Sequence, residues 1–321
     1  LAVTSTNKAA GEMRERLRTI LGPEITRALW IGTFHAVCVR LIRRYHESIG
    51  IGPNFTIYDD SDQKALMTRI LKDLGIDDRR HPPQQILSRI QREKQEARGP
   101  DQFERRDYRD DVTIKAYVEY QRRLREANAC DFSDLLLYVL ELAERQNDPD
   151  AEHLRARFDH VLVDEFQDVN HVQYRLVKAL GQSRNICVVG DDDQSIYRWR
   201  GADVRNIRGF TSDFADTKLV KLEQNYRSSQ HIVAAALGII RHASQRQAKE
   251  LWTANDAGEP VRIVSCANER DEANYVVRGV QRFLAAQVPA NEMAVFYRVH
   301  AQSRVLEEAM RAANIPYQII G

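Results

Sequence analysis

Val161-Leu162-Val163-Asp164-Glu165-Phe166-Gln167-Asp168 is the run from which the fold class follows. Three apolar β-formers lead directly into two adjacent carboxylates, which is typical of a strand buried on both faces of a parallel sheet. Ligands of open α/β sheets bind outside the carboxyl ends of the strands, so Asp164 and Glu165 lie where a site is expected. One carboxylate could hold Mg²⁺ while the other activates a water that attacks a phosphate. This run alone does not separate a nucleotide hydrolase from a solvated acidic turn.

A second run of the same design is Asn185-Ile186-Cys187-Val188-Val189-Gly190-Asp191-Asp192-Asp193-Gln194. Two neighbouring strands of this kind would deliver polar groups to one crevice. The chain then continues Ser195-Ile196-Tyr197-Arg198-Trp199-Arg200-Gly201-Ala202, in which two aromatic residues alternate with arginines. Aromatic faces stack on bases and guanidinium groups pair with phosphates, which favours single-stranded nucleic acid. Taken alone, the same residues are more often core aromatics with surface arginines.

These runs closely resemble motifs II and III of the UvrD/PcrA/Rep family of superfamily 1 DNA helicases, and further motifs follow in the order of that family. The further matches are Leu1-Ala2-Val3-Thr4-Ser5-Thr6-Asn7-Lys8-Ala9-Ala10 (motif Ia), Gly32-Thr33-Phe34-His35-Ala36 (motif Ib), Asp131-Phe132-Ser133-Asp134-Leu135-Leu136, Gln224-Asn225-Tyr226-Arg227-Ser228-Ser229 (motif IV), Tyr297-Arg298, Ala301-Gln302-Ser303-Arg304 and Ile315-Pro316-Tyr317. Ordered matches over nearly the whole chain identify it as a member of this family.

The resemblance implies an α/β fold with two RecA-like parallel-sheet motor domains, both incomplete, the first of which carries an all-helical insertion. The expected divisions are 1–59 and 128–215 for the first motor domain, 60–127 for the insertion and 216–321 for the second motor domain. Apolar spacing predicts helices over 7–21, 269–286 and 301–313, with Ser228 or Ser229 capping another, and strands over 217–222, 261–264 and 293–297. The mixed charges of 60–127 are typical of a solvated face, although some arginines could contact nucleic acid.

The resemblance also implies which residues bind ATP and Mg²⁺. Asp164 would bind Mg²⁺ and Glu165 would activate water. Gln194 would contact the γ-phosphate, and Arg227 would stabilise its developing charge across an interdomain cleft, which suits a permanently charged planar donor. Tyr226 would stack on the adenine. Without the surrounding motif, Tyr226 and Arg227 would be a pair buried at a helix start.

The implied contacts with DNA involve aromatic side chains and groups that bind the backbone. Bases would lie between Phe132, Tyr197 and Trp199, and the phosphodiester backbone would contact Thr4, Thr33, His35 and Arg200. The implied activity is 3′-to-5′ movement on single-stranded DNA, driven by ATP, that separates strands at duplex junctions. Repair or replication proteins are the partners expected of such an enzyme.

Composition is compatible with this class of protein. The formal net charge of the 321 residues is +1, so affinity for nucleic acid must come from a local patch. The four cysteines lack metal-ligand spacing, which predicts reduced thiols in the cytoplasm and no zinc. No apolar run approaches the ~18 residues of a membrane span, so we expect no membrane association. At this length we expect two or more globular units, each with a hydrophobic core.

The chain departs from the family at several positions. The sequence contains no Gly-rich phosphate loop ending in Gly-Lys-Ser/Thr, which the family carries just before its motif Ia. Because the chain also ends before motifs V and VI, we expect the middle portion of a longer helicase that is inactive on its own. Ser5 stands where many relatives carry Phe, which calls one base-stacking contact into question. Val169 and Val299-His300 also differ from the residues that are usual there.

Two alternative functions stay open from the sequence. The same motifs occur in the helicase portion of recombination helicase–nucleases. A catalytically inactive DNA-binding module would keep the fold and lack the phosphate loop. The presence of Glu165, Gln194 and Arg227 together argues against such a module, because a decayed site has no need of all three groups.

Overall fold

The computed structural model describes residues 1–107, 109–243 and 249–320 of the chain. The described residues divide into two compact units, one of residues 1–221 and one of residues 222–243 and 249–320. Each unit has a hydrophobic cluster of its own. Among the described residues, no helix is both long and apolar enough to cross a membrane.

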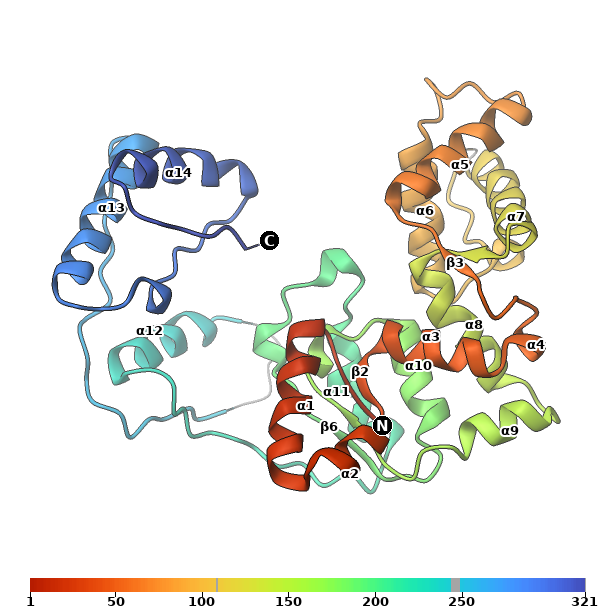
Figure 1. Ribbon diagram of the computed structural model, residues 1–321, viewed down its shortest axis with the longest axis horizontal. Helices are drawn as coiled ribbons and strands as arrows, with labels where there is room; N and C mark the ends of the chain where they lie inside the picture. The colour runs from red at the N-terminus through yellow and green to blue at the C-terminus, as the bar shows by residue number, and fades with distance from the viewer. Residues whose placement is uncertain (108, 244–248, 321) are drawn as a thin grey trace. The chain divides into compact units, whose positions relative to one another are not determined.

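A parallel four-stranded sheet forms the centre of the first unit, in the order β2-β1-β5-β6 (Figure 1). The strands are β1 (Ala2–Thr4), β2 (Ile31–Thr33), β5 (Val161–Val163) and β6 (Ile186–Val188). The apolar runs that precede Asp164 and Gly190 are therefore adjacent strands, and the parallel α/β class is confirmed. The expectation that the first of these strands is buried on both faces is wrong, because Leu162 in the middle of β5 is 48% exposed. In register, Val3 lies opposite Val163, and Val163 lies opposite Val188, so all three strands end at one level.

Helices pack on this sheet because their apolar positions recur at helical spacing. The helix predicted over 7–21 is confirmed: Thr6 caps it by accepting the Ala9 N–H at 3.1 Å, and Gly22 ends it with φ of 84°. The helices of this part are α1 (Asn7–Leu21), α2 (Pro23–Ala28), α3 (Phe34–Arg44), α4 (His46–Ile49), α8 (Phe132–Glu144), α9 (Pro149–Arg155), α10 (His171–Leu180) and α11 (Val204–Asp213). The most deeply buried is α8, which packs against both α3 and α10.

Three further helices gather around a second core within the first unit (Figure 1). They are α5 (Asp60–Asp73), α6 (Pro83–Gln95) and α7 (Asp110–Glu126), and all three lie within residues 60–127, the range expected to form an all-helical insertion. A short parallel pair, β3 (Thr56–Ile57) and β4 (Ala129–Cys130), joins the two ends of this segment. A 3₁₀ turn, η1 (Pro100–Gln102), precedes α7. Several charged side chains of residues 60–127 are buried rather than solvated, Glu93, Lys94 and Asp110 among them. Each of these three lies in an ion pair.

The regular elements in the described residues of the second unit are helices. It contains α12 (Gln230–Ile240), α13 (Glu269–Ala285), α14 (Ser303–Ala312) and the 3₁₀ turns η5 (Ala290–Glu292) and η6 (His300–Gln302). Ser229 is the residue at the N-cap of α12, but its side chain makes no capping hydrogen bond. Val277, Met310 and Ile315 form the core of this unit, where α13 packs against α14. These two helices confirm those predicted over 269–286 and 301–313.

The strands predicted over 217–222, 261–264 and 293–297 are wrong, because the structure forms no strand in these ranges. A strand needs a neighbour that completes its hydrogen bonds and covers its apolar face. Here Ile263 is 99% exposed and Phe296 is 94% exposed, so no neighbour covers these apolar side chains. The only β-type pairing among the described residues of this unit is an isolated bridge between Gln224 and Trp252.

Candidate functional site

The strand ends of the central sheet bring the first pair of predicted residues together. Thr4 ends β1 and Asp164 directly follows β5, so both stand at the carboxyl edge of the sheet. The Thr4 hydroxyl donates a hydrogen bond of 3.4 Å to Oδ2 of Asp164. Thr4 is buried, whereas Asp164 is half-buried and open to a ligand. Thr4 therefore supports the carboxylate, a role different from the predicted contact with a DNA phosphate.

Glu165 adopts an unusual backbone conformation at the same edge. Its φ of 52° and ψ of 43° are left-handed, a region that non-glycine residues rarely occupy and that is enriched at functional sites. The turn η2 (Phe166–Asp168) follows directly. Nε2 of Gln167 donates a hydrogen bond of 2.6 Å to Oε2 of Glu165, which fixes the direction of the carboxylate. Burial and, to a lesser degree, the Glu165 charge raise the pKa of Asp168.

Gln167 connects the two acidic strand ends and was not among the predicted site residues. Its side chain is 1% exposed, and its Oε1 accepts the backbone N–H of Asp191 at 2.9 Å. One amide therefore ties the Glu165 carboxylate to the loop after β6. The signal in the sequence is a polar residue placed between the apolar Phe166 and Val169, both of which are buried.

Gly190 lets these two loops approach closely. A Cβ at this position would lie 2.7 Å from Oε1 of Gln167 and 3.1 Å from the backbone nitrogen of Phe166. The distance to Gln167 is too short for a real Cβ, so the buried Gln167 amide would have to move. Any side chain here would therefore separate Gln167 from Asp191.

Gln194 lies at the end of the acidic turn η3 (Asp192–Gln194). Its Nε2 donates a hydrogen bond of 2.8 Å to Oδ2 of Asp191, and the Ser195 hydroxyl reaches the backbone oxygen of Gln167 at 3.4 Å. Carboxylate oxygens of Asp191, Asp192 and Asp193 lie within 4.8 Å of one another. The structure thus joins Glu165 and the Gln194 loop through Gln167, as one continuous polar edge.

A second group of predicted residues lies where α3 and α8 begin. Thr33 caps α3 by accepting the Ala36 N–H at 3.3 Å, and Phe132 is the first residue of α8. The Phe132 ring is 51% exposed and meets the His35 ring edge-on, with 6.1 Å between centroids. Burial lowers the pKa of His35, so its imidazole is neutral at physiological pH.

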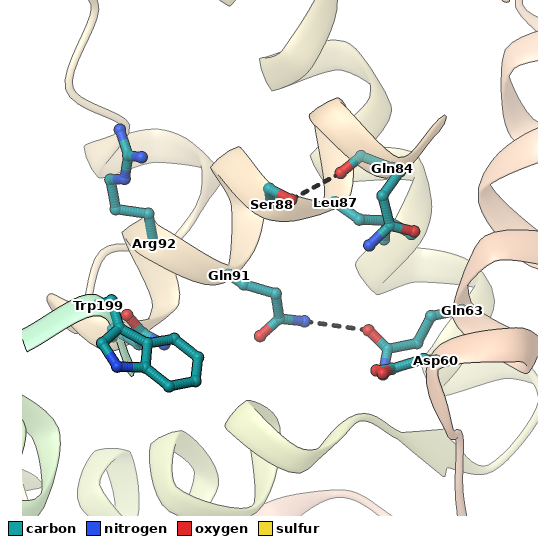
Figure 2. Close-up of a pocket in the computed structure, with 9 residues that line it drawn as sticks. Asp60, Gln63, Gln84, Leu87, Ser88, Gln91, Arg92 and Trp199 are labelled. Atoms are coloured by element: carbon teal, nitrogen blue, oxygen red, sulfur yellow. Dashed lines mark hydrogen bonds between the residues drawn. The ribbon is translucent and has the colours of Figure 1, made fainter. Parts of the chain in front are cut away.

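Tyr197 and Trp199 form a third group around the turn η4 (Arg198–Arg200). Their rings are tilted against each other, with centroids 6.4 Å apart. The Trp199 side chain is 72% exposed, and it lines a cavity of about 300 Å³ that is otherwise formed by residues of α5 and α6 (Figure 2). The side chain of Arg200, also predicted to contact DNA, lies outside the described residues.

The last two predicted residues lie in the second unit. The Tyr226 ring is 77% exposed, and its hydroxyl donates to Oε1 of Gln224 at 2.7 Å. Oδ1 of Asn225 accepts the backbone N–H groups of Arg227 and Ser228 at 3.0 and 2.8 Å. Asn225 therefore holds the loop in an Asx turn that presents Tyr226 and Arg227 at the surface. Asn225 is a further residue that the predicted set did not include.

Comparison with known proteins identifies helicase domains along nearly the whole chain. Residues 1–215 match the UvrD/REP helicase N-terminal domain, and residues 220–321 match the UvrD-like helicase C-terminal domain. The chain is 44% identical over 324 aligned positions to a protein of Staphylococcus epidermidis named ATP-dependent DNA helicase PcrA, and 42% identical to one of that name from Staphylococcus aureus. The match covers all of this chain and 44% of each relative, so the chain spans less than half the length of these relatives.

Proposed function

Because this chain belongs to the UvrD/PcrA/Rep family of DNA helicases, we propose that it provides the nucleotide and DNA contacts of an ATP-dependent DNA helicase. This helicase would use Mg-ATP hydrolysis to move 3′-to-5′ on single-stranded DNA and to unwind duplex junctions. The observation that supports this most is the polar edge at which Gln167 joins Glu165 to the Gln194 loop.

The polar edge suits the chemistry of phosphoryl transfer to water. The half-buried Asp164 carboxylate, which the Thr4 hydroxyl supports, offers oxygen ligands of the kind that Mg²⁺ prefers, so this residue fits the metal. Bound Mg²⁺ would neutralise charge on the phosphates of ATP. Glu165, whose carboxylate Gln167 orients, would position the attacking water and accept its proton. Gln194 would contact the γ-phosphate, and its hydrogen bond to Asp191 would connect that contact to Gln167 and Glu165.

The second unit would contribute two groups to the same reaction. Arg227 would stabilise negative charge on the γ-phosphate, since its planar donors match phosphate oxygens. Tyr226 would stack on the adenine. The Asx turn of Asn225 supports these roles because it fixes the backbone that carries both side chains.

DNA would contact exposed aromatic rings of the first unit. Phe132, Tyr197 and Trp199 are all partly exposed at element ends or turns, as stacking platforms for unpaired bases require. Backbone phosphates would contact Thr33, His35 and Arg200. Within this proposal the first unit is a RecA-like motor domain with residues 60–127 as a helical insertion, and the second unit is part of a second motor domain.

Single-stranded DNA binding tests the proposal directly. Fluorescence anisotropy with a labelled oligothymidylate should show binding that weakens as salt rises, because phosphate contacts release counterions. Trp199→Ala should weaken binding about tenfold or more, since stacking contributes roughly 1–3 kcal/mol per base. Ile20→Ala is the matched control, an equally exposed apolar side chain on α1. Absence of binding, or equal losses in both variants, would contradict the proposal.

The direction of movement has its own test. In a form of the protein that hydrolyses ATP, a duplex with a single-stranded 3′ tail should be unwound, and one with a 5′ tail should not. Unwinding of the 5′-tailed duplex alone would reverse the proposed direction.

A further inference from the structure

A fully buried ion cluster lies between α6 and the start of α8. Nζ of Lys94 contacts Oδ2 of Asp131 at 2.7 Å and Oδ1 of Asp134 at 2.6 Å, and all three side chains are 0% exposed. Lys94 comes from the helical segment 60–127, whereas both carboxylates come from the motif that follows it. The cluster therefore fastens α6 to α8 from inside.

The two carboxylates are also the cap of α8. Oδ1 of Asp131 accepts the backbone N–H of Asp134 at 2.9 Å, and Oδ2 of Asp134 accepts the N–H of Asp131 at 3.1 Å. This capping box fixes the first turn of the helix, in which Phe132 is the first residue. Lys94 thus contacts both capping residues of the turn that carries the exposed Phe132 ring.

The remaining partners of the cluster leave its groups little freedom. Gln91 and Tyr120 donate to Oδ2 of Asp131 at 3.0 and 3.1 Å, and Gln121 donates to Oδ1 of Asp134 at 3.1 Å. Burial alone would lower the pKa of Lys94, but the two carboxylates outweigh it and raise that pKa, so the ammonium stays charged. Four donors from two helices therefore meet at one helix start.

The same helix also contacts the turn that carries Trp199. A Cβ on Gly201 would lie 2.6 Å from Oε1 of Gln95, so the Gln95 side chain rests directly on this turn. Figure 2 shows the Trp199 indole and the Gln91 amide on the same side of α6, where both line the cavity. One turn of α6 thus touches the supports of two exposed aromatic rings, Phe132 through Lys94 and Trp199 through Gln95.

We infer that Lys94 is a positioning residue for single-stranded DNA, which sets the place of Phe132 relative to Trp199 by fixing the start of α8 on α6. The inference rests on the proposed function, because it assumes that these rings stack on bases. Buried ion clusters are rarely needed for stability, since apolar residues of similar volume are often as stable. Their directional hydrogen bonds do specify one arrangement, which is what a fixed spacing of two bases requires.

The test removes the cluster without leaving a buried charge unpaired. The triple variant Lys94→Met, Asp131→Asn and Asp134→Asn is neutral, and Asn remains a good N-cap residue. We expect it to unfold within a few degrees of the wild-type chain and to bind oligothymidylate about tenfold more weakly. Glu93→Gln is the matched control, because Glu93 is a buried acid on the same helix that pairs with Arg98. That control should bind like the wild type.

A double-mutant cycle separates positioning from a merely structural role. Phe132→Ala should weaken binding about tenfold in the wild-type chain and by less than threefold in the triple variant, because the ring there is already misplaced. Quenching of 2-aminopurine in the oligonucleotide should fall in parallel. Binding within twofold of wild type by the triple variant, or an equal effect of Phe132→Ala in both backgrounds, overturns the inference. No DNA binding by the wild-type chain overturns the proposed function itself, and the inference falls with it.

Discussion

The carboxylates at the sheet edge and those at the start of α8 are the same chemical group in opposite settings. Asp164 and Glu165 are half-buried, and each side chain receives one hydrogen bond from a neutral neighbour, Thr4 or Gln167. Asp131 and Asp134 are 0% exposed and receive a shared ammonium together with several neutral donors. A carboxylate that must meet a ligand keeps lone pairs open to it, whereas one that holds the fold in place has them filled.

The largest expected effect is the loss of ATP turnover in Glu165→Gln. In a form of the protein that hydrolyses ATP, turnover should fall about 10²–10⁴-fold, because an amide cannot accept the proton of the attacking water. The fold should persist, since the new amide oxygen can still accept from Gln167. Steady-state ATP hydrolysis with saturating single-stranded DNA measures the effect. Glu12→Gln, an exposed acid on α1, is the control and should hydrolyse normally.

DNA binding by Glu165→Gln should equal that of the wild type. Loss of turnover and binding together would show that Glu165 supports the structure, and the contrast between the two sets of carboxylates would disappear.

The next largest effect is on stability and lies in the other region. Lys94→Met alone should destabilise the first unit by about 3–5 kcal/mol, because it leaves two carboxylates buried without their cation. The neutral triple variant should regain most of this loss. Urea denaturation followed by circular dichroism measures both. A single variant as stable as the wild type would mean that water reaches Asp131 and Asp134 once the ammonium is gone.

Periodicity in the sequence predicted much of the first unit. The helix over 7–21 and the two strands that precede Asp164 and Gly190 are local features, because apolar spacing predicts the helix and short apolar runs predict the strands. Neither Gln167 nor Lys94 could be identified in that way. Lys94 lies 37 residues before Asp131 in a segment rich in both charges. Only the folded chain shows that this lysine faces inward.

The second unit shows the opposite limit of sequence reasoning. Apolar runs such as 261–264 have strand composition, but a strand also needs a neighbour that the run itself does not specify. Its helices were predictable because a helix satisfies its own backbone hydrogen bonds. The loop of Tyr226 and Arg227 was recognised by its motif, whereas the Asx turn of Asn225 that shapes it is visible only in the structure.

Stability should also depend on pH through Asp134. Burial and the adjacent Asp131 raise the pKa of Asp134 to about 6. The folded chain therefore binds more protons than the unfolded chain between about pH 4 and pH 6, and this contribution to stability is lost as pH rises through that window. The loss should be on the order of 1–3 kcal/mol. Urea denaturation of wild type and Asp134→Asn from pH 4 to pH 7 measures it.

The contribution of Asp131 to stability depends on pH in the opposite direction. Burial would raise the pKa of Asp131, but Lys94 outweighs it and lowers that pKa, so Asp131 loses its stabilising charge only as pH falls below about 4. The decline from pH 4 to pH 6 should therefore be smaller in Asp134→Asn and unchanged in Glu93→Gln. An equal decline in all three proteins would assign it to groups outside the cluster.

The smallest effects compare two glycines, one at the sheet edge and one on an open helix. Gly190→Ala should destabilise the first unit by roughly 1–3 kcal/mol, because the added methyl would press on Gln167 and the backbone of Phe166. Gly11→Ala in α1 meets nothing within 4 Å and should stabilise by about 0.5–1 kcal/mol through lower chain entropy. Thermal unfolding of both variants gives opposite signs if close approach is the reason for Gly190. A stable Gly190→Ala variant that hydrolyses ATP normally would show that Glu165 and the Gln194 loop do not depend on the bridge through Gln167.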